Sequence, residues 1–582
     1  MAHPRRDFWL RAAAVLLLRG VPACALDRDQ YFYSDIFTPF FSAEPAAGGK
    51  TLFKTRRPGS AAGQEFVEPK PENTTRVFVV GGSIANVFLS VRREPEVRLD
   101  RVLARAFPGR SFEVIDCGMS GYDSYRESLV LEEVLARRPD AVIVMTGNNE
   151  AYGEGQVNRL LRGVFRGLSR SAAFRALRGR FIRKLAAHGP RMPDNSQLAR
   201  ARWLEAFEGN LRGMARAAKS AGIPIVLCAL PVNFQDIPPE GELPLDDIDF
   251  LRGFEALARA DVPAALAHLR RHARAAPQEP FGRYYAAKSW EALGGYKQAR
   301  ASYWAALERD RLVRCSPSAN NVIRRVAREE GAALADIEAA FLSAAPRGLL
   351  GREMFLDDVH WHLECNRLAD RAVLSALLAL AQEGWTGLGP RDAWNAAAIK
   401  AAESFCAADR VRLDPELRRQ IDEKRLLYAV GAVLDSRALR ASRGGPRRFS
   451  ERALAFFDMI LSGDKETVLR LGRRKDSLSG KLEANIWSEQ RARDFEAAWP
   501  EVLMHAGESL RRRRLYREAV SLFDQALALA PALRRARVFR AAAFGALRRK
   551  QRALADLEPL ASDAGLPEAR FFFDEMARPG KL

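Results

Sequence analysis

Ser83 has the residue type and the position of a catalytic nucleophile. It follows an apolar run, Val77–Val80, and the pair Gly81-Gly82, after which apolar residues resume at helical spacing. This pattern predicts a buried strand, a tight turn and a helix. The serine then lies at the carboxyl end of the strand, where open parallel sheets bind their ligands. The alternative is that Ser83 only caps the following helix.

The segment Met354–His362 contains the two groups that activate a serine. His360 follows Asp357 by three residues, and the chain has only seven histidines. A nucleophilic serine needs a base that takes its proton and a carboxylate that orients the base. Asp358 offers an alternative partner for His360. His362 has no carboxylate three residues before it, and we interpret it as a bystander.

The surrounding sequence predicts an α/β domain. Apolar runs typical of buried strands also occupy residues 111–118, 139–145, 223–231 and 332–337, and amphipathic segments that predict helices separate them. Strands that alternate with helices in this way form a parallel sheet covered by helices. The long gap between the last two strands indicates an insertion.

Four blocks at the ends of the predicted strands and beyond the last one resemble those of the SGNH/GDSL hydrolase superfamily: Gly81-Gly82-Ser83, Gly118–Gly121, Gly147–Glu150 and Asp357–His360. The resemblance covers about residues 71–235 and 315–385. It implies a three-layer α/β/α fold with a five-stranded parallel sheet. It also implies the roles of the site residues: Ser83 as nucleophile, His360 as base, Asp357 as its orienting carboxylate, and Gly121 and Asn149 as oxyanion donors through a backbone N–H and a side-chain amide.

The chain departs from the family's pattern near the site. Gly82 and Glu150 both stand where the family usually has aspartate, and Asp358 resembles the Asp-x-His arrangement of SGNH polysaccharide O-acetyltransferases. The resemblance implies a serine esterase or acylhydrolase that cleaves an O-acyl ester of a glycan or lipid, with no cofactor and no metal. The alternatives are an SGNH-type O-acyltransferase acting on a polysaccharide and a catalytically inactive repeat scaffold.

Two other parts of the chain repeat with a period of 34 residues. Ala265 and Leu269 recur as Ala299 and Tyr303, and similar residues recur between 507 and 557. A 34-residue helical repeat with small residues where helices touch resembles the tetratricopeptide pattern. The expected organisation is a signal peptide or anchor at 1–25, an irregular leader at 26–70, the hydrolase domain at 71–235 and 315–385, a tetratricopeptide-like insertion at 245–314, a helical region at 386–495, and C-terminal tetratricopeptide-like repeats at 496–575.

The chain of 582 residues is basic, with 92 Lys and Arg against 72 Asp and Glu and a net charge of +20. Such a balance suits nucleic acid, an anionic membrane or an acidic polymer. No zinc-finger, basic-zipper or RNA-binding pattern accompanies it, so we expect no nucleic-acid partner. The segment 157–187 mixes basic and apolar residues, as a membrane-surface helix, an active-site lid or an ordinary amphipathic helix pair would. The helical repeats are candidates for binding a protein partner.

The N-terminus has the pattern of an export signal. A basic start, an apolar core at residues 12–18 and the small residues Ala23-Cys24-Ala25 predict an extracytoplasmic protein of the periplasm or cell envelope. Arg19 interrupts the short core, so a degenerate membrane anchor or a simple helix is the alternative. The six cysteines show no CxxC pair and no metal spacing.

Overall fold

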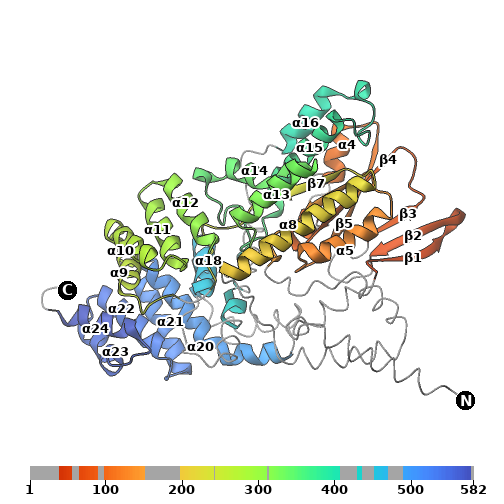
Figure 1. The fold of residues 1–582 in the computed structure, drawn as a ribbon. Coiled ribbons are helices and arrows are strands. Elements are labelled where there is room, and N and C mark those ends of the chain that lie inside the picture. Colours follow the sequence, from red (N-terminus) through yellow and green to blue (C-terminus); the bar gives the residue numbers. More distant parts are fainter. Residues whose placement is uncertain are drawn as a thin grey trace, which may run out of the picture. The chain divides into compact units, whose positions relative to one another are not determined.

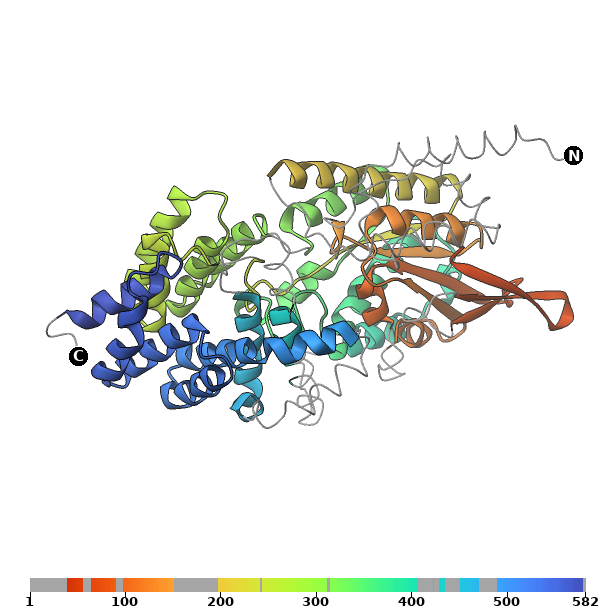
Figure 2. The same cartoon turned by 90° about the horizontal axis from the view of Figure 1, so that it is seen from below.

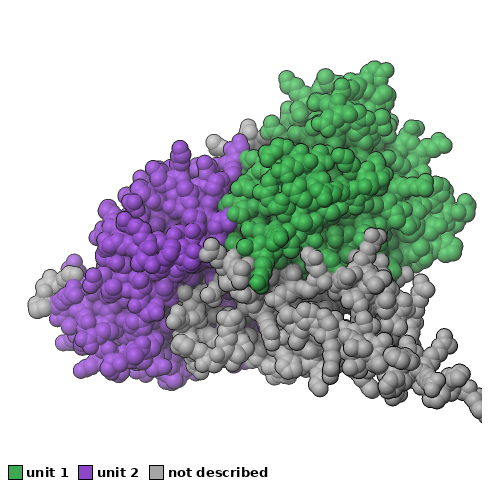
Figure 3. Space-filling model, in the orientation of Figure 1, with its two compact units in different colours: residues 1–230, 313–340, 366–408 green, residues 231–312, 341–365, 409–582 purple. Residues whose placement is uncertain are grey.

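The computed structural model (Figures 1 and 2) describes residues 39–55, 64–89, 98–150, 197–240, 243–310, 314–406, 451–469 and 489–578, and a few positions between 422 and 434. The chain divides into two compact units (Figure 3). Unit 1 comprises residues 1–230, 313–340 and 366–408, and unit 2 comprises residues 231–312, 341–365 and 409–582.

Unit 1 contains a five-stranded sheet in which all neighbouring strands are parallel. Its strands lie in the order β5-β4-β6-β7-β8. Their bounds are β4 (Thr74–Gly81), β5 (Ser111–Gly118), β6 (Ala141–Met145), β7 (Ile225–Ala229) and β8 (Ala333–Asp336). Every residue of β4, β6 and β7 is buried, which explains their continuous apolar runs. The predicted five-stranded parallel sheet is confirmed.

Helices cover both faces of this sheet (Figure 2). Helices α5 (Ser124–Leu135), α8 (Gln197–Ser220) and α13 (Pro317–Glu330) pack together on one face, and α4 (Leu99–Ala106), α15 (Asn366–Gln382) and α16 (Ala396–Cys406) form the group on the other. The predicted three-layer arrangement is therefore confirmed. The helix predicted after the Ser83 turn is the short α3 (Ser83–Phe88), and α4 follows it as a separate helix.

Part of the predicted irregular leader forms a small antiparallel sheet. Strands β1 (Phe41–Ala46), β2 (Lys50–Thr55) and β3 (Glu65–Glu68) pair in chain order, and a 3-10 turn at Ala47–Gly49 joins the first two. Phe53 stacks on Phe66, and the Phe66 ring lies edge-on to Phe78 of β4 with centroids 5.3 Å apart. The prediction of irregular structure over 26–70 is wrong for these strands, because contacts between aromatic side chains order them without a clear sequence period.

Unit 2 consists mainly of paired helices. The insertion contributes α9 (Ile248–Ala258), α10 (Val262–Ala275), α11 (Phe281–Ala292) and α12 (Tyr296–Leu307). The C-terminal part contributes α18 (Glu451–Leu469), α20 (Glu489–Arg512), α21 (Tyr516–Leu529), α22 (Arg534–Ala546), α23 (Lys550–Leu557) and α24 (Pro567–Ala577). Consecutive helices pack against each other within each set, as the 34-residue period predicts. Their assignment to the tetratricopeptide family stays a prediction.

Small residues allow the paired helices to approach closely. A β-carbon placed on Gly253 of α9 would lie 2.7 Å from Leu269 Cγ of α10, and one on Gly507 of α20 would lie 2.7 Å from Phe523 Cε1 of α21. Ala265 of α10 is fully buried. Gly253 and Gly507 are thus positions at which neighbouring helices touch.

A buried polar network joins helices of the insertion to helices of the C-terminal part. The Arg512 guanidinium donates to Glu451 Oε1 (2.6 Å) and to the Tyr285 hydroxyl (3.1 Å), and it lies over the Phe254 ring at 4.9 Å. The Tyr285 hydroxyl also donates to Glu451, whose side chain is only 2% exposed. Segments far apart in the sequence therefore share one core in unit 2.

Replacing Arg512 by methionine is expected to lower the free energy of unfolding by about 3 kcal/mol, because the buried carboxyl group of Glu451 loses the cation that compensates its charge. Thermal unfolding followed by circular dichroism measures the loss. Arg513→Met is the matched control, since Arg513 is the next residue of the chain and is exposed. An Arg512→Met melting temperature equal to that of the control would contradict the stabilising role of the network.

Several sequence predictions concern features outside the described residues. Residues 1–25 and 157–187 belong there, so the export signal and the basic membrane or lid segment stay predictions. Within the described ranges, no helix is long and apolar enough to cross a membrane, and no group of three or more side chains is arranged to hold a metal ion. The five cysteines in these ranges are buried, and no disulfide joins any two of them.

Candidate active site

Ser83 lies at the junction of β4 and α3. The strand ends at Gly81, Gly82 is the N-cap, and Ser83 is the first residue of the helix. A β-carbon on Gly81 would lie 2.5 Å from the Met145 carbonyl oxygen, so only glycine fits beside β6 at this point. The predicted strand, tight turn and helix are confirmed, and the Ser83 side chain is partly exposed.

The loop after β5 contains Gly121, the predicted backbone donor. Its φ of 74° lies in the left-handed region, which glycine adopts without strain. The loop then enters α5, whose N-cap is Asp123: the Arg126 N–H donates to Asp123 Oδ1 at 3.0 Å. Gly121 thus lies at the carboxyl end of β5, the strand beside β4.

The loop after β6 contains Asn149, and its amide lies beside the serine turn. Asn149 Nδ2 donates to the Tyr122 carbonyl oxygen at 2.9 Å. A β-carbon on Gly82 would lie 2.8 Å from the same nitrogen, so the aspartate that the family usually has at this position would not fit here without movement. The structure therefore brings the Asn149 amide, the Tyr122 carbonyl and the Gly82 backbone together at one edge of the sheet.

A buried carboxylate ties the Asn149 loop to the start of α5. Glu150 accepts hydrogen bonds from the Ser124 N–H (3.1 Å), the Ser124 hydroxyl (2.6 Å) and the Thr146 hydroxyl (3.3 Å). The Ser124 hydroxyl also accepts a hydrogen bond from Asn210 Nδ2 of α8 at 3.0 Å. Glu150, which the sequence marks only as a departure from the family, is thus an anchor of this loop.

Sequence reasoning did not identify Glu127, a second buried carboxyl group beside Glu150. Burial raises the pKa of Glu127 well above its ordinary value, and the Glu150 carboxylate raises it further. Burial also raises the pKa of Glu150 to about 8. The Asp123 charge raises this pKa further, and the hydrogen bonds from Ser124 and Thr146 lower it. One signal was present in the sequence: Glu127 precedes Leu131 and Val134 at helical spacing on the apolar face of α5.

Asp357 and His360 form a hydrogen-bonded pair in unit 2. Asp357 Oδ2 lies 2.8 Å from His360 Nδ1, and Asp357 Oδ1 accepts the backbone N–H groups of His360 (2.7 Å) and Val359 (3.0 Å). Burial alone would raise the pKa of Asp357, but the His360 charge and these hydrogen bonds lower it to about 2. The carboxylate is therefore ionised and oriented at neutral pH.

The neighbouring groups on this loop support that pairing. Asn233 fixes the loop backbone: its N–H donates to the Asp358 carbonyl oxygen (2.9 Å), and its Nδ2 donates to the Asp357 carbonyl oxygen (3.1 Å). His362 is buried, and its Nε2 lies 3.0 Å from the Arg352 carbonyl oxygen, which agrees with its interpretation as a bystander. The predicted site residues thus form two groups, with Ser83, Gly121 and Asn149 in unit 1 and Asp357 and His360 in unit 2.

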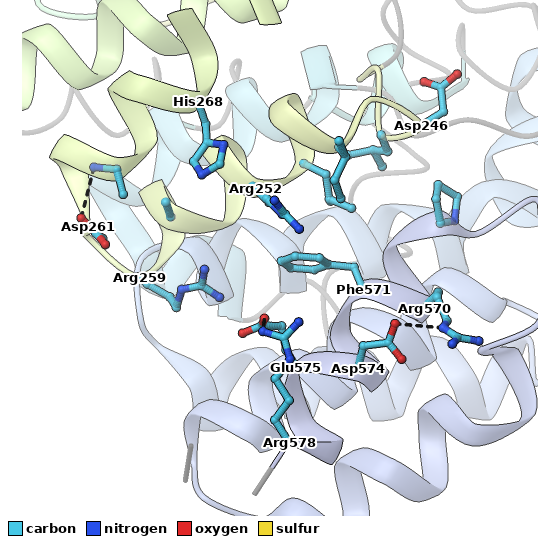
Figure 4. A pocket seen from close by; sticks show the side chains of 16 residues that line it. Asp246, Arg252, Arg259, Asp261, His268, Arg570, Phe571, Asp574, Glu575 and Arg578 are labelled. Carbon is cyan, nitrogen blue, oxygen red and sulfur yellow. Dashed lines mark hydrogen bonds and ion pairs between the residues drawn. The ribbon is translucent and has the colours of Figure 1, made fainter. Parts of the chain in front are cut away.

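Unit 2 also contains a cavity of about 380 Å³ lined by α9, α10 and α24 (Figure 4). Arg252 and Phe571 project toward its centre, and Arg570 pairs with Asp574 at its rim. His268 is bound to Asp249 with 2.7 Å between Nδ1 and Oδ1. The lining contains no hydroxyl or thiol side chain, so this cavity has no nucleophile of the kind that Ser83 offers.

No protein-family model and no curated protein matches the chain. Solved structures of low similarity include the acetyl xylan esterase AlAXEase (15% identity, 52% of this chain and 99% of the other, TM-score 0.26) and TesA (16% identity, 53% and 99%, TM-score 0.25). A GDSL-like lipase from Bacteroides thetaiotaomicron has 13% identity over 53% of this chain and 88% of its own, with a TM-score of 0.26. A similarity this low carries no conclusion about the function of this chain.

Proposed function

We propose that the chain is a serine esterase or acylhydrolase that cleaves an O-acyl ester. In the proposed reaction, Ser83 Oγ forms a bond to the ester carbonyl carbon while its proton passes to His360. The alcohol leaves with that proton, and water then hydrolyses the acyl-serine with His360 again as base. The proposal requires His360 Nε2 to reach Ser83 Oγ.

The observation that carries the proposal is the geometry of Asp357 and His360. A carboxylate that is ionised at neutral pH and bound to Nδ1 holds the imidazole in the tautomer that accepts a proton at Nε2. Asp357 is itself fixed by two backbone N–H groups. An oriented Asp-His pair of this kind is what a serine nucleophile needs for activation.

The loops around Ser83 support the proposed oxyanion hole. The Gly121 and Ser83 N–H groups and the Asn149 amide are the proposed donors to the negative oxygen of the tetrahedral intermediate. One hydrogen of the Asn149 amide is bound to Tyr122, which fixes the direction of the other. Donors that are oriented in advance stabilise the developing charge, each by about 3 kcal/mol.

The proposed substrate is an acyl ester of a glycan or lipid, and the proposed location is outside the cytoplasm. The export-signal pattern of residues 1–25 supports the location. Every proposed step uses side chains and backbone groups of this chain alone, so the proposal includes neither a metal nor a cofactor.

Labelling with a fluorophosphonate probe tests the proposal. The probe reacts with activated serines, so we expect it to label the wild-type protein and neither Ser83→Ala nor His360→Ala. Ser220→Ala and His268→Ala are matched controls, since Ser220 is exposed and His268 belongs to another Asp-His pair. A correctly folded wild-type protein that is not labelled would overturn the proposal and favour the inactive repeat scaffold.

Gly82→Ala is expected to lower kcat for p-nitrophenyl acetate by about 10²-fold, because its β-carbon would displace the Asn149 amide by a few tenths of an ångström or more. Steady-state kinetics measures the change. Gly109→Ala is the control, since a β-carbon there meets nothing within 4 Å. Unchanged kcat in a folded Gly82→Ala protein would show that catalysis does not depend on the position of the Asn149 amide, and would exclude this amide as an oxyanion donor.

A further inference from the structure

Two buried carboxyl groups lie near the serine turn and Asn149: Glu127 beside Gly82, and Glu150 next to Asn149 in the chain. Glu127 is 1% exposed and Glu150 is 6% exposed. Glu127 extends from α5 toward the serine turn, so that a β-carbon on Gly82 would lie 3.8 Å from its Oε1 and 2.8 Å from Asn149 Nδ2. The Asn149 amide and the Glu127 carboxyl group therefore both lie on the side of Gly82 toward which a β-carbon would point.

Hydrogen bonds hold Asn149 from two directions. Its own amide donates to the Tyr122 carbonyl oxygen, in the loop that precedes α5. The next residue, Glu150, accepts from the backbone N–H and the hydroxyl of Ser124, the first residue of α5. Because Glu150 is the next residue of the chain, its hydrogen bonds to Ser124 also restrain the backbone at Asn149.

Glu127 and Glu150 lie close enough to each other and to Asp123 for the Glu150 charge to act on Glu127 and the Asp123 charge to act on both glutamates. Burial and mutual repulsion favour the neutral form of a carboxyl group in such a place. A neutral carboxylic acid both donates and accepts hydrogen bonds, so it can be packed against polar groups without a counter-ion. This arrangement allows buried acids to serve as rigid spacers.

We propose that Glu127 and Glu150 are positioning residues that hold the Asn149 amide against the Gly82–Ser83 turn, at the place where an oxyanion donor is needed. The inference rests on the proposed esterase function. It assigns neither glutamate a contact with substrate: both act through Asn149. Glu150 sets the position of the Asn149 backbone, and Glu127 fills the space behind its amide.

Side-chain length, rather than charge, should then decide the activity. Glu150→Gln keeps the length, and its amide can bind Ser124, whose hydroxyl accepts as well as donates. We expect kcat within about threefold of wild type. Glu150→Asp withdraws the carboxyl group by about 1.5 Å and should lower kcat by about 10²-fold with little change in KM. Glu132→Asp, on the exposed face of α5, is the matched control.

A double-mutant cycle separates positioning from a general loss of structure. In an Asn149→Ala background, Glu150→Asp should change kcat by less than about twofold, because the group through which it acts is already absent. An equal loss in both backgrounds would overturn the inference, and so would wild-type kcat in Glu150→Asp. Wild-type labelling by the fluorophosphonate probe, measured on the same samples, tests the esterase function separately.

Discussion

Asp357→Asn is expected to lower kcat for ester hydrolysis by about 10⁴-fold while leaving the fold intact. In the wild-type protein Asp357 Oδ1 accepts two backbone N–H groups, and Oδ2 faces His360 Nδ1. The single oxygen of asparagine must take the place of Oδ1, so its NH₂ group faces Nδ1 and donates to it. The imidazole proton then moves to Nε2, which can no longer accept the proton of Ser83.

Two measurements check this result. The kcat for p-nitrophenyl acetate and the rate of fluorophosphonate labelling should fall together, because both need an activated serine. Asp249→Asn is the matched control, since Asp249 binds His268 Nδ1 at 2.7 Å in the same unit without a proposed role in catalysis. A folded Asp357→Asn protein that keeps more than a tenth of the wild-type kcat would exclude the proposed base.

The places of the catalytic candidates in unit 1 follow from local sequence. Ser83, Gly121 and Asn149 each follow a strand whose last five residues are all buried, so an apolar run marks where the strand ends and the loop begins. Because neighbouring parallel strands end at the same edge, three such loops are expected side by side. This part of the site could be predicted without knowledge of tertiary contacts.

The support behind these loops could not be predicted in the same way. The position of Glu127 beside the Gly82 turn depends on how α5 packs over the sheet, and helix spacing alone indicates only that Glu127 faces inward. The 34-residue period likewise predicts paired helices but not the partner of each pair. The network of Arg512, Glu451 and Tyr285 joins segments more than 160 residues apart, and no local pattern encodes it.

The buried carboxyl groups predict an unusual dependence of stability on pH. The pKa of Glu150 is raised from 4.5 to about 8 in the folded protein. A group whose pKa is higher in the folded state binds its proton more tightly there than in the unfolded state. The proton therefore makes its full contribution to the free energy of unfolding below pH 4.5, and this contribution is lost as the pH rises through 8. Over that interval we expect Glu150 alone to reduce the free energy of unfolding by about 4 kcal/mol.

Glu150→Gln should remove this loss, because glutamine does not titrate and keeps the contacts with Ser124. Its melting temperature should therefore be close to that of the wild type near pH 5 and clearly higher at pH 8, as thermal unfolding at both values would measure. Glu132→Gln, exposed on α5, should show the same dependence of melting temperature on pH as the wild type.

If the wild type and Glu150→Gln lose stability in parallel between pH 5 and 8, Glu150 is already ionised in the folded protein. The site would then depend on a buried carboxylate at Glu150, and Glu150→Gln should impair kcat as strongly as Glu150→Asp. The stability and kinetic measurements thus both test whether Glu150 is protonated in the folded protein.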